Sequence, residues 1–167
     1  MIEIKSLTGT VLYSCDYGSV RECAVDAVIH KASLCGADLT CADLTDADLR
    51  RADLTGADLR GAYMTRANLT GATYGKYPMT IPPLHLLGMH WDVMVLDDAI
   101  KIGCELHSTD EWERFSDDEI AQMDSRALDF WRAHKGAIMA LADSRAVATD
   151  QDGINITEEL NTPRGNT

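Results

Sequence analysis

The sequence contains no long apolar run and few aromatic residues. No segment approaches the roughly 20 apolar residues that a membrane-spanning helix needs, and residues 1–13 lack the apolar stretch of a signal peptide. We therefore expect the protein to stay in the cytoplasm. Aromatic residues make up only 6% of the 167 positions, but hydrophobic residues make up 46%, which is enough for an ordinary globular core.

The cysteines show no paired spacing. There are five, an odd number, and no two form a Cys-x-x-Cys motif. This usage fits free thiols in a reducing compartment better than a disulfide framework. Because no histidine or cysteine spacing is typical of metal ligands, we expect neither a metal site nor another cofactor. The cysteines are Cys15, Cys23, Cys35, Cys41 and Cys104.

Basic residues are scarce, and the acidic excess is unevenly distributed. The formal net charge is −12, and between Asp92 and Asp124 eleven acidic residues stand against two basic ones. Residues 32–75 carry six aspartates and four arginines. Since a nucleic-acid backbone attracts clustered lysine and arginine, this balance argues against direct nucleic-acid binding.

A five-residue repeat is the most prominent pattern in the sequence. Alanine occupies every fifth position from Ala32 to Ala72, and a leucine follows two places later in seven of the nine repeats. Neither an α-helix nor a flat strand keeps a five-residue pattern on one face, so the chain has to turn a corner in each repeat. Met64 and Tyr74 fill the two other positions. The leucines predict a continuous apolar axis and are Leu34, Leu39, Leu44, Leu49, Leu54, Leu59 and Leu69.

Repeats of this form, Ala-Asp-Leu-Thr-Gly with the variants Ala-Asp-Leu-Arg-Arg and Ala-Asn-Leu-Thr-Gly, resemble the pentapeptide-repeat family. The resemblance implies a mainly β fold, in which residues 32–75 form a short right-handed quadrilateral β-helix with four repeats in each coil. Residues 20 apart should then stack. Asp38 would lie beneath Asp58, and Asp46 would form a surface ion pair with Arg66.

In residues 1–31 we predict a β-hairpin followed by a helix that caps the coil. Apolar and polar residues alternate at both ends of the stretch 2–13. Residues 19–22, Ser-Val-Arg-Glu, have the form of a capping box, and apolar residues then recur at helical spacing as far as Val28. The end of a β-helix exposes unpaired strand groups, which this helix would cover. The alternative is that the segment is one more, degenerate pentapeptide.

Residues 76–107 follow a proline-rich break and no longer keep the repeat. The apolar segments 90–96 and 99–106 flank Asp97 and Asp98, and this pattern predicts a second β-hairpin. We expect it to continue the stack as a wide final coil and so to close the C-terminal end of the coil.

Residues 108–145 are predicted to be helical, with a short acidic turn from Thr109 and a capping box at 116–119. The capping box should begin a single amphipathic helix that runs from Asp117 to Ala142. Its apolar seam either packs on the coil or pairs with the same helix of another chain, giving a homo-oligomer. The residues from 146 to 167 read as a flexible tail. The candidate oligomer seam is Ile120, Met123, Ala127, Phe130 and Ile138.

We expect no enzymatic activity and therefore no catalytic residues. Cys104 and His107 stand three apart and could be read as a nucleophile with its base. No glycine-rich phosphate loop, nucleophile elbow or paired-ligand motif accompanies them. Residues of these types at the end of a hairpin are more often packed or solvated.

The sequence favours a non-catalytic binding protein, in which an acidic and aromatic surface beside a rigid coil engages a partner protein. One alternative is an oligomer that sequesters a small signalling nucleotide. The acidic balance opposes that function unless Arg50, Arg51 or Lys76 meet across an interface. The candidate partner-binding residues are Trp91, Asp110, Glu111, Trp112, Glu113 and Trp131.

A second alternative follows from the family resemblance, because some proteins of this kind imitate DNA and inhibit type II topoisomerases. The coil is short for that role. Little more than two coils, about 4.8 Å apart, span roughly 11 Å.

The layout as a whole also resembles small proteins of phages and prophages. The resemblance rests on the N-terminal Ile-Glu-Ile-Lys segment, the few pentapeptides, and the stretch from Ile102-Gly103-Cys104 through Trp112 to Phe130-Trp131. It implies action in the cytoplasm of a bacterial host. There the protein would inhibit or modulate a defence or nucleic-acid-processing protein through protein–protein contact, without contacting a membrane.

Overall fold

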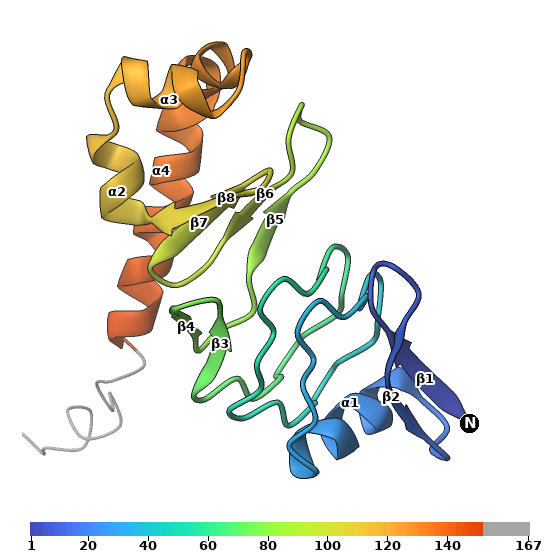
Figure 1. Cartoon of the computed structure of the whole chain (residues 1–167). Coiled ribbons are helices and arrows are strands. Elements are labelled where there is room, and N and C mark those ends of the chain that lie inside the picture. Colours follow the sequence, from blue (N-terminus) through green and yellow to red (C-terminus); the bar gives the residue numbers. More distant parts are fainter. Residues whose placement is uncertain (152–167) are drawn as a thin grey trace, which may run out of the picture.

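The computed structural model describes residues 1–151, in which a repeat coil stands beside a sheet covered by helices (Figure 1). We call residues 32–75 the coil and residues 84–145 the sheet–helix unit. Before the coil lie β1 (Ile2–Lys5), β2 (Val11–Cys15) and α1 (Val20–Ile29). At its end and beyond lie β3 (Ala72–Tyr74), β4 (Tyr77–Met79), β5 (Leu84–Leu86), β6 (Val93–Val95), β7 (Ala99–Ile102), β8 (Glu105–Ser108), α2 (Thr109–Arg114), α3 (Asp117–Met123) and α4 (Ala127–Gln151).

The coil is β-helix-like, because residues 20 positions apart in the sequence form parallel β-bridges between neighbouring layers. Asp38 bridges Asp58, and three further bridges follow at five-residue steps, ending with Asp53 and Thr73. The predicted ion pair is present between Asp46 and Arg66, with 2.6 Å from Oδ1 to Nε. Twenty residues therefore separate neighbouring layers, as the family resemblance implied.

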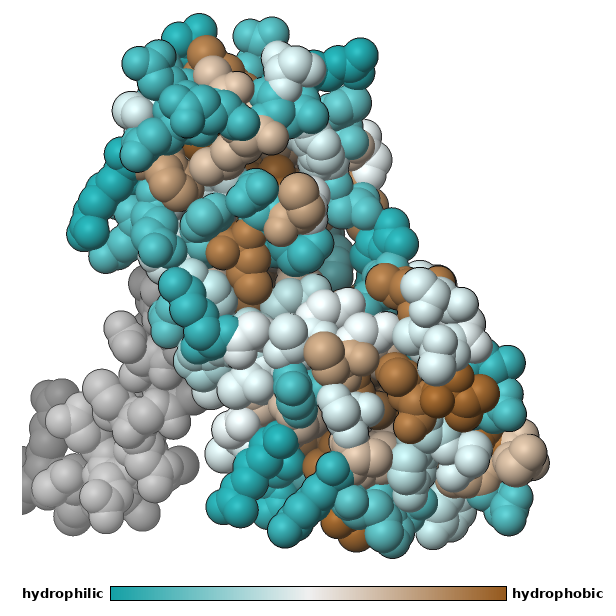
Figure 2. All heavy atoms as spheres, in the orientation of Figure 1, coloured by the Kyte–Doolittle hydropathy of each residue, from teal (hydrophilic) through white to brown (hydrophobic). Residues whose placement is uncertain are grey.

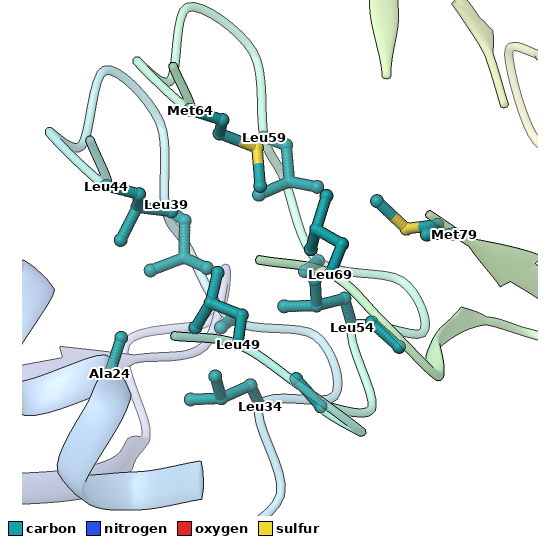
Figure 3. Close-up of a cluster of buried hydrophobic side chains, with 14 of the residues drawn as sticks. Ala24, Leu34, Leu39, Leu44, Leu49, Leu54, Leu59, Met64, Leu69 and Met79 are labelled. Carbon is teal, nitrogen blue, oxygen red and sulfur yellow. The ribbon is translucent and has the colours of Figure 1, made fainter. Parts of the chain in front are cut away.

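The repeat leucines form the axis of the coil. Figure 3 shows Leu34, Leu39, Leu44 and Leu49 in one layer and Leu54, Leu59, Met64 and Leu69 in the next. Each of the seven leucines exposes at most 2% of its surface. Burial of a leucine side chain contributes roughly 1.5–3 kcal/mol, so this column is the main stabilising feature of the coil.

Each repeat turns at the residue before its alanine. At nine successive positions of this kind φ lies between +55° and +74°. From Ala37 onward the alanine N–H donates to the carbonyl of the residue three places earlier. Left-handed backbone costs a residue with a side chain about 1 kcal/mol. Five of the nine positions nevertheless carry one, so stacking of the layers outweighs the local cost. The five are Lys31, Cys41, Asp46, Arg51 and Arg66.

The aspartate of each repeat holds the local turn. In five repeats an aspartate side-chain oxygen accepts a hydrogen bond from the backbone N–H two residues later, at 3.0 to 3.3 Å. Asn68 makes the same bond to Thr70 at 3.1 Å. The repeat therefore uses the oxygen atom for a side-chain turn and does not depend on the negative charge.

The N-terminal hairpin and α1 cover the first layer of the coil, as predicted. The backbone N–H of Asp38 donates to the carbonyl of Lys5 at 2.7 Å, which pairs β1 with the open edge. Ser19 caps α1, and its side chain accepts from the N–H of Glu22. Ala24 and Ala27 are fully buried, and Figure 3 shows Ala24 beside the leucine layers.

The other end of the coil differs from the prediction of a final wide coil. The β3–β4 hairpin ends the repeats, and Met79 packs beside Leu54 and Leu69 (Figure 3). Beyond it stands an antiparallel sheet in the order β5-β6-β7-β8, not a two-stranded hairpin. The predicted strand 99–106 is interrupted at Gly103, whose φ is +58°, so the chain turns back there.

The sheet is buried on both faces, which explains its continuous apolar sequence. Met94, Leu96 and Ala99 pack in the core of the coil. Val93, Val95, Ile100 and Ile102 belong to the core under the helices. Neighbouring residues of a strand point to opposite faces, so the sheet joins two cores.

The predicted single helix from Asp117 to Ala142 is wrong, because the chain breaks between α3 and α4. The side-chain Oδ1 of Asp124 accepts from the backbone N–H of Arg126 at 2.8 Å, and its carbonyl accepts from the N–H of Ala127. The seam packs on the sheet, not on the coil. Residues 146–151, predicted to begin a tail, belong to α4, and the rest of that predicted tail lies outside the described residues.

A buried ion pair fastens α4 to the sheet and to the linker after β4. Arg145 Nη2 lies 3.1 Å from Asp97 Oδ1, and both residues are buried. Arg145 also donates to the carbonyls of Leu96 and Pro82, while Thr80 donates to Asp97 through its N–H and hydroxyl at 2.6 Å. These bonds satisfy both charges without water, as a buried pair requires.

Candidate functional site

An aromatic cavity of about 100 Å³ lies between the β7–β8 turn and helices α2, α3 and α4. Its lining comes from segments up to 40 residues apart, so it exists only in the folded chain. We call it the aromatic cavity. Its walls are Trp91, Trp112, Phe130 and Trp131; its aliphatic lining is Ile102, Ile120, Met123 and Ala127; its polar side is Gly103, Cys104, Glu105 and Asp124.

The rings are held in fixed orientations. Trp91 and Phe130 meet edge to face, with centroids 5.1 Å apart and planes at 79°. Trp112 and Trp131 are also 5.1 Å apart, at 38°. The indole N–H of Trp112 donates to the carbonyl of Ile100 at 2.7 Å, which satisfies the polar atom of a buried ring.

The turn after β7 leaves space for the ring of Trp91. A Cβ atom on Gly103 would lie 3.1 Å from Cδ1 of Trp91, closer than side chains normally approach. Trp91 is only half-buried, whereas Trp112, Phe130 and Trp131 are buried. The Trp91 ring is therefore the wall that solvent reaches.

Two carboxylates line the cavity. Glu105 Oε2 lies 3.2 Å from His107 Nε2, and its other oxygen accepts from the Cys104 thiol at 3.7 Å. Asp124 accepts from the backbone of Arg126 and from the hydroxyl of Ser125. No lysine or arginine belongs to the lining. The potential at this site is therefore negative.

The acidic helix starts beside the cavity stay ionised to low pH. Glu111 Oε2 accepts from the N–H and the hydroxyl of Ser108, which lowers the pKa of Glu111 to about 2. The same bonds between Glu119 and Ser116 lower the pKa of Glu119. Figure 2 shows the outer surface of this unit as largely hydrophilic, with small hydrophobic areas between.

The structure gathers the predicted aromatic residues but buries most of them. Trp112 and Trp131 expose 2% and 3% of their surface, so they are core residues that line a cavity and are not part of an open surface. Sequence alone did not show the sheet on which they pack. Asp110 and Glu113 are exposed as predicted, and Glu111 is exposed but engaged in the capping box of α2.

The seam residues gather at the same place. Ile120, Met123, Ala127 and Phe130 line the aromatic cavity, and Ile138 is fully buried farther along α4. Because these side chains pack within the chain, pairing with a second copy would require α4 to leave the sheet. Self-association through this seam stays a prediction.

The sequence reasoning missed the polar side of the cavity. Glu105 and Asp124 stand next to chain breaks that were predicted as continuous strand and helix. The signals available were Gly103 within an apolar strand, and the turn-forming sequence Asp124-Ser125-Arg126 within a helical pattern.

Cys104 and His107 do not form a nucleophile and base. Both contact Glu105, and the His107 ring packs edge-on against Trp112 and Phe115. All five cysteines are free, as predicted. Within the part of the chain that the structure describes, no group of three or more histidine, cysteine or acidic residues could hold a metal ion.

A second cavity, of about 260 Å³, lies where the coil meets the sheet. Arg60 joins the two parts there, because it pairs with Asp58 of the coil and with Asp92, 2.7 Å away, in the sheet–helix unit. His85 lines this cavity, and its Nε2 atom is buried without a hydrogen-bond partner. Burial lowers the pKa of His85, so the ring is kept neutral.

No helix among the described residues is both long and apolar enough to cross a membrane. Searches of curated proteins and of solved structures found no match. A family model described as pentapeptide repeats matches residues 26–56 and 42–73, with eight copies of the repeat. The coil is therefore a run of pentapeptide repeats, as the five-residue period predicted.

Proposed function

We propose that this chain is a non-catalytic binding protein whose sheet–helix unit engages a basic partner protein at the aromatic cavity and the acidic helix α2. One observation carries the proposal. Residues from the sheet and three helices converge on a cavity that has four aromatic rings, two carboxylates and no cationic side chain. Aromatic side chains inside a polar, acidic rim are typical of the places where proteins bind most strongly.

Charge supports a basic partner. The stretch from Asp92 to Asp124 has eleven acidic and two basic residues, and α2, whose Trp112 lines the cavity, exposes Asp110 and Glu113. Electrostatic complementarity of this kind raises the rate of association and selects the partner more than it adds affinity. The coil then serves as a rigid base for the sheet through their shared core.

The size of the cavity favours one partner side chain over a nucleotide. Pockets for whole small molecules usually measure about 300–1,000 Å³. The coil arginines also support this choice, because Arg50, Arg60 and Arg66 each hold a carboxylate of the same chain. Sequestration of a signalling nucleotide is thus the weaker proposal.

Imitation of DNA is also the weaker proposal. The repeat aspartates hold the turns of the coil, and Asp46, Asp48 and Asp58 are paired with arginines. Their charges are therefore partly neutralised within the chain, whereas a DNA mimic needs a continuous negative stripe.

The remaining details of the proposal come from the sequence. The likeness to small phage proteins makes the partner a host protein and the effect inhibition or modulation. The coil would be the right-handed quadrilateral form of β-helix, for which the bridges at a spacing of 20 give support. Homo-oligomerisation through the seam of Ile120, Met123, Ala127, Phe130 and Ile138 stays part of the proposal and would require α4 to leave the sheet.

The experiment is capture of a partner from bacterial lysate by the tagged protein, followed by reversal of charge. Asp110→Lys with Glu113→Lys reverses two exposed charges of α2 and spares the capping residue Glu111. Glu3→Lys with Asp16→Lys makes the same change on the N-terminal hairpin and is the control. We expect the first pair to weaken capture at least tenfold at low salt and less at high salt, and the control to leave it unchanged. Equal loss in both pairs would refute a partner site beside α2.

A further inference from the structure

We infer that the aromatic cavity binds a methylated ammonium group, such as the trimethylammonium head of a modified lysine side chain or of choline. The identity of the molecule that carries this group rests on the proposed function. The recognition of the head group rests only on the cavity itself.

The walls present several aromatic rings to one small volume. The planes of Trp91 and Phe130 stand at 79°, and those of Trp112 and Trp131 at 38°, so the four lining rings are not all parallel to one another. The face of an aromatic ring is negative and attracts a cation, most strongly for tryptophan. Lys135 shows this within the chain, because its Nζ lies 5.3 Å from the centroid of the Trp131 ring.

The polar side supplies the matching charge. Glu105 and Asp124 line the cavity, and neither forms an ion pair with a lysine or an arginine among the described residues. A cation entering here would meet two carboxylates that no permanent cation balances. An anion would meet the same two charges and be rejected.

The size and the aromatic walls of the cavity select a methylated cation over a plain one. Its volume of about 100 Å³ is small, which suits a single head group. A bare lysine ammonium is strongly hydrated and loses that water at a cost between apolar walls. Methyl groups remove the N–H donors and contact the rings directly, while the positive charge remains.

The principal test compares choline with 3,3-dimethylbutan-1-ol, which has the same shape but carbon in place of the charged nitrogen. Binding to the full chain would be followed by calorimetry and by the NMR signals of the indole N–H groups. We expect choline to bind about 5- to 30-fold more tightly, the range given by a cation–π contribution of about 1–2 kcal/mol. Equal binding of the two compounds, or no binding of either, would overturn the inference.

Matched variants locate the site. Glu105→Gln should weaken choline binding severalfold and leave the neutral alcohol unaffected, because it removes charge and little volume. Glu113→Gln, on the exposed side of α2, is the control and should change neither. Trp91→Leu should weaken choline as well, and since Trp91 is half-buried, the variant is expected to fold. Should it unfold, the comparison of Glu105→Gln with Glu113→Gln still decides, and equal affinity in these two variants would refute the site.

Two further ligands distinguish the sources of the head group. A short peptide with one trimethyllysine should bind more tightly than choline if the carrier is a partner protein, and its unmethylated form should bind more weakly. Choline binding more tightly than the peptide would support a free small molecule. Capture of a partner by the acidic helix without choline binding would overturn this inference alone, and choline binding without capture would overturn the proposed partner alone.

Discussion

The coil and the sheet–helix unit lie side by side and share one face of the sheet, but they are stabilised in different ways. In the coil the same small set of contacts recurs every five residues, and each layer repeats the one before it. In the sheet–helix unit single residues have no counterpart, such as the buried pair of Asp97 and Arg145 or the Trp112 indole bonded to Ile100. Repetition gives a rigid and regular body, whereas unique contacts create the aromatic cavity on which the proposed function rests.

The largest effect is expected from a charge on the axis of the coil. Leu49 is fully buried between layers, so Leu49→Asp would place an unpaired carboxylate among leucines. Its desolvation costs several kcal/mol, comparable with the 5–15 kcal/mol that stabilises a whole domain. We expect no folded protein by circular dichroism. The neighbouring change Asp48→Ser, which keeps an oxygen for the turn, should lower the melting temperature by only a few degrees, and equal effects of the two would contradict the assigned axis.

The next largest effect comes from comparing an aspartate–arginine ion pair in each region. Asp97→Asn leaves Arg145 charged and buried, which typically costs 3–5 kcal/mol. Asp46→Asn removes the exposed pair with Arg66, which contributes little because water screens it, and asparagine tolerates the left-handed backbone at this corner. Urea unfolding measures both. If Asp46→Asn destabilised the protein as much as Asp97→Asn, the contrast between the regions would fail.

The two ion pairs also show which contacts can be predicted from the sequence and which cannot. The period of five predicted the buried leucines, and the family resemblance, with four repeats in each coil, added the stacking at 20 and the Asp46–Arg66 pair. Asp97 and Arg145 are 48 residues apart, and nothing near either residue signals the other. The same limit explains the tryptophans. Trp112 and Trp131 looked like a binding surface until the sheet that buries them was known.

The breaks in regular structure were the other limit. A strand was predicted across Gly103 and a helix across Asp124, because the apolar pattern continues through both. In the fold, the turn at Gly103 makes room for Trp91, and the turn at Asp124 sets α4 at a new angle to α3. The aromatic cavity lies between these two turns. Part of the candidate site is therefore formed by residues whose secondary structure was predicted wrongly from the sequence.

A smaller effect is expected at the junction of the two regions. Burial lowers the pKa of His85, and Asp58, Asp92, Arg60 and Lys101 face the same cavity. A base with a lowered pKa binds fewer protons in the folded state than in the unfolded state. The free energy of unfolding should therefore fall as the pH drops below about 6.5. We expect His85→Gln to flatten this fall between pH 7.5 and pH 5, whereas the exposed His90→Gln should not. An unchanged slope in His85→Gln would show that the ring does not resist protonation.

The smallest effect concerns a contact that joins the two regions. Glu111 completes the capping box of α2 with Ser108, and it also accepts a hydrogen bond from the hydroxyl of Tyr77, in the hairpin that ends the coil. Its pKa is lowered to about 2, from an ordinary value near 4.5. A carboxyl with a lowered pKa stabilises the fold fully above its unfolded pKa and loses this contribution as the pH falls toward the folded value.

Glu111→Ala should therefore melt at a lower temperature than the wild type at pH 7, and the difference should shrink between pH 4.5 and pH 3. Glu113→Ala, two residues away on the same helix, causes the same change in charge and helix propensity as Glu111→Ala. It removes neither the cap nor the bond to Tyr77. It should stay close to the wild type at every pH, so the gap between the two variants isolates the capping contact. A gap that stayed constant down to pH 3 would mean that the carboxylate of Glu111 is not what links α2 to the end of the coil.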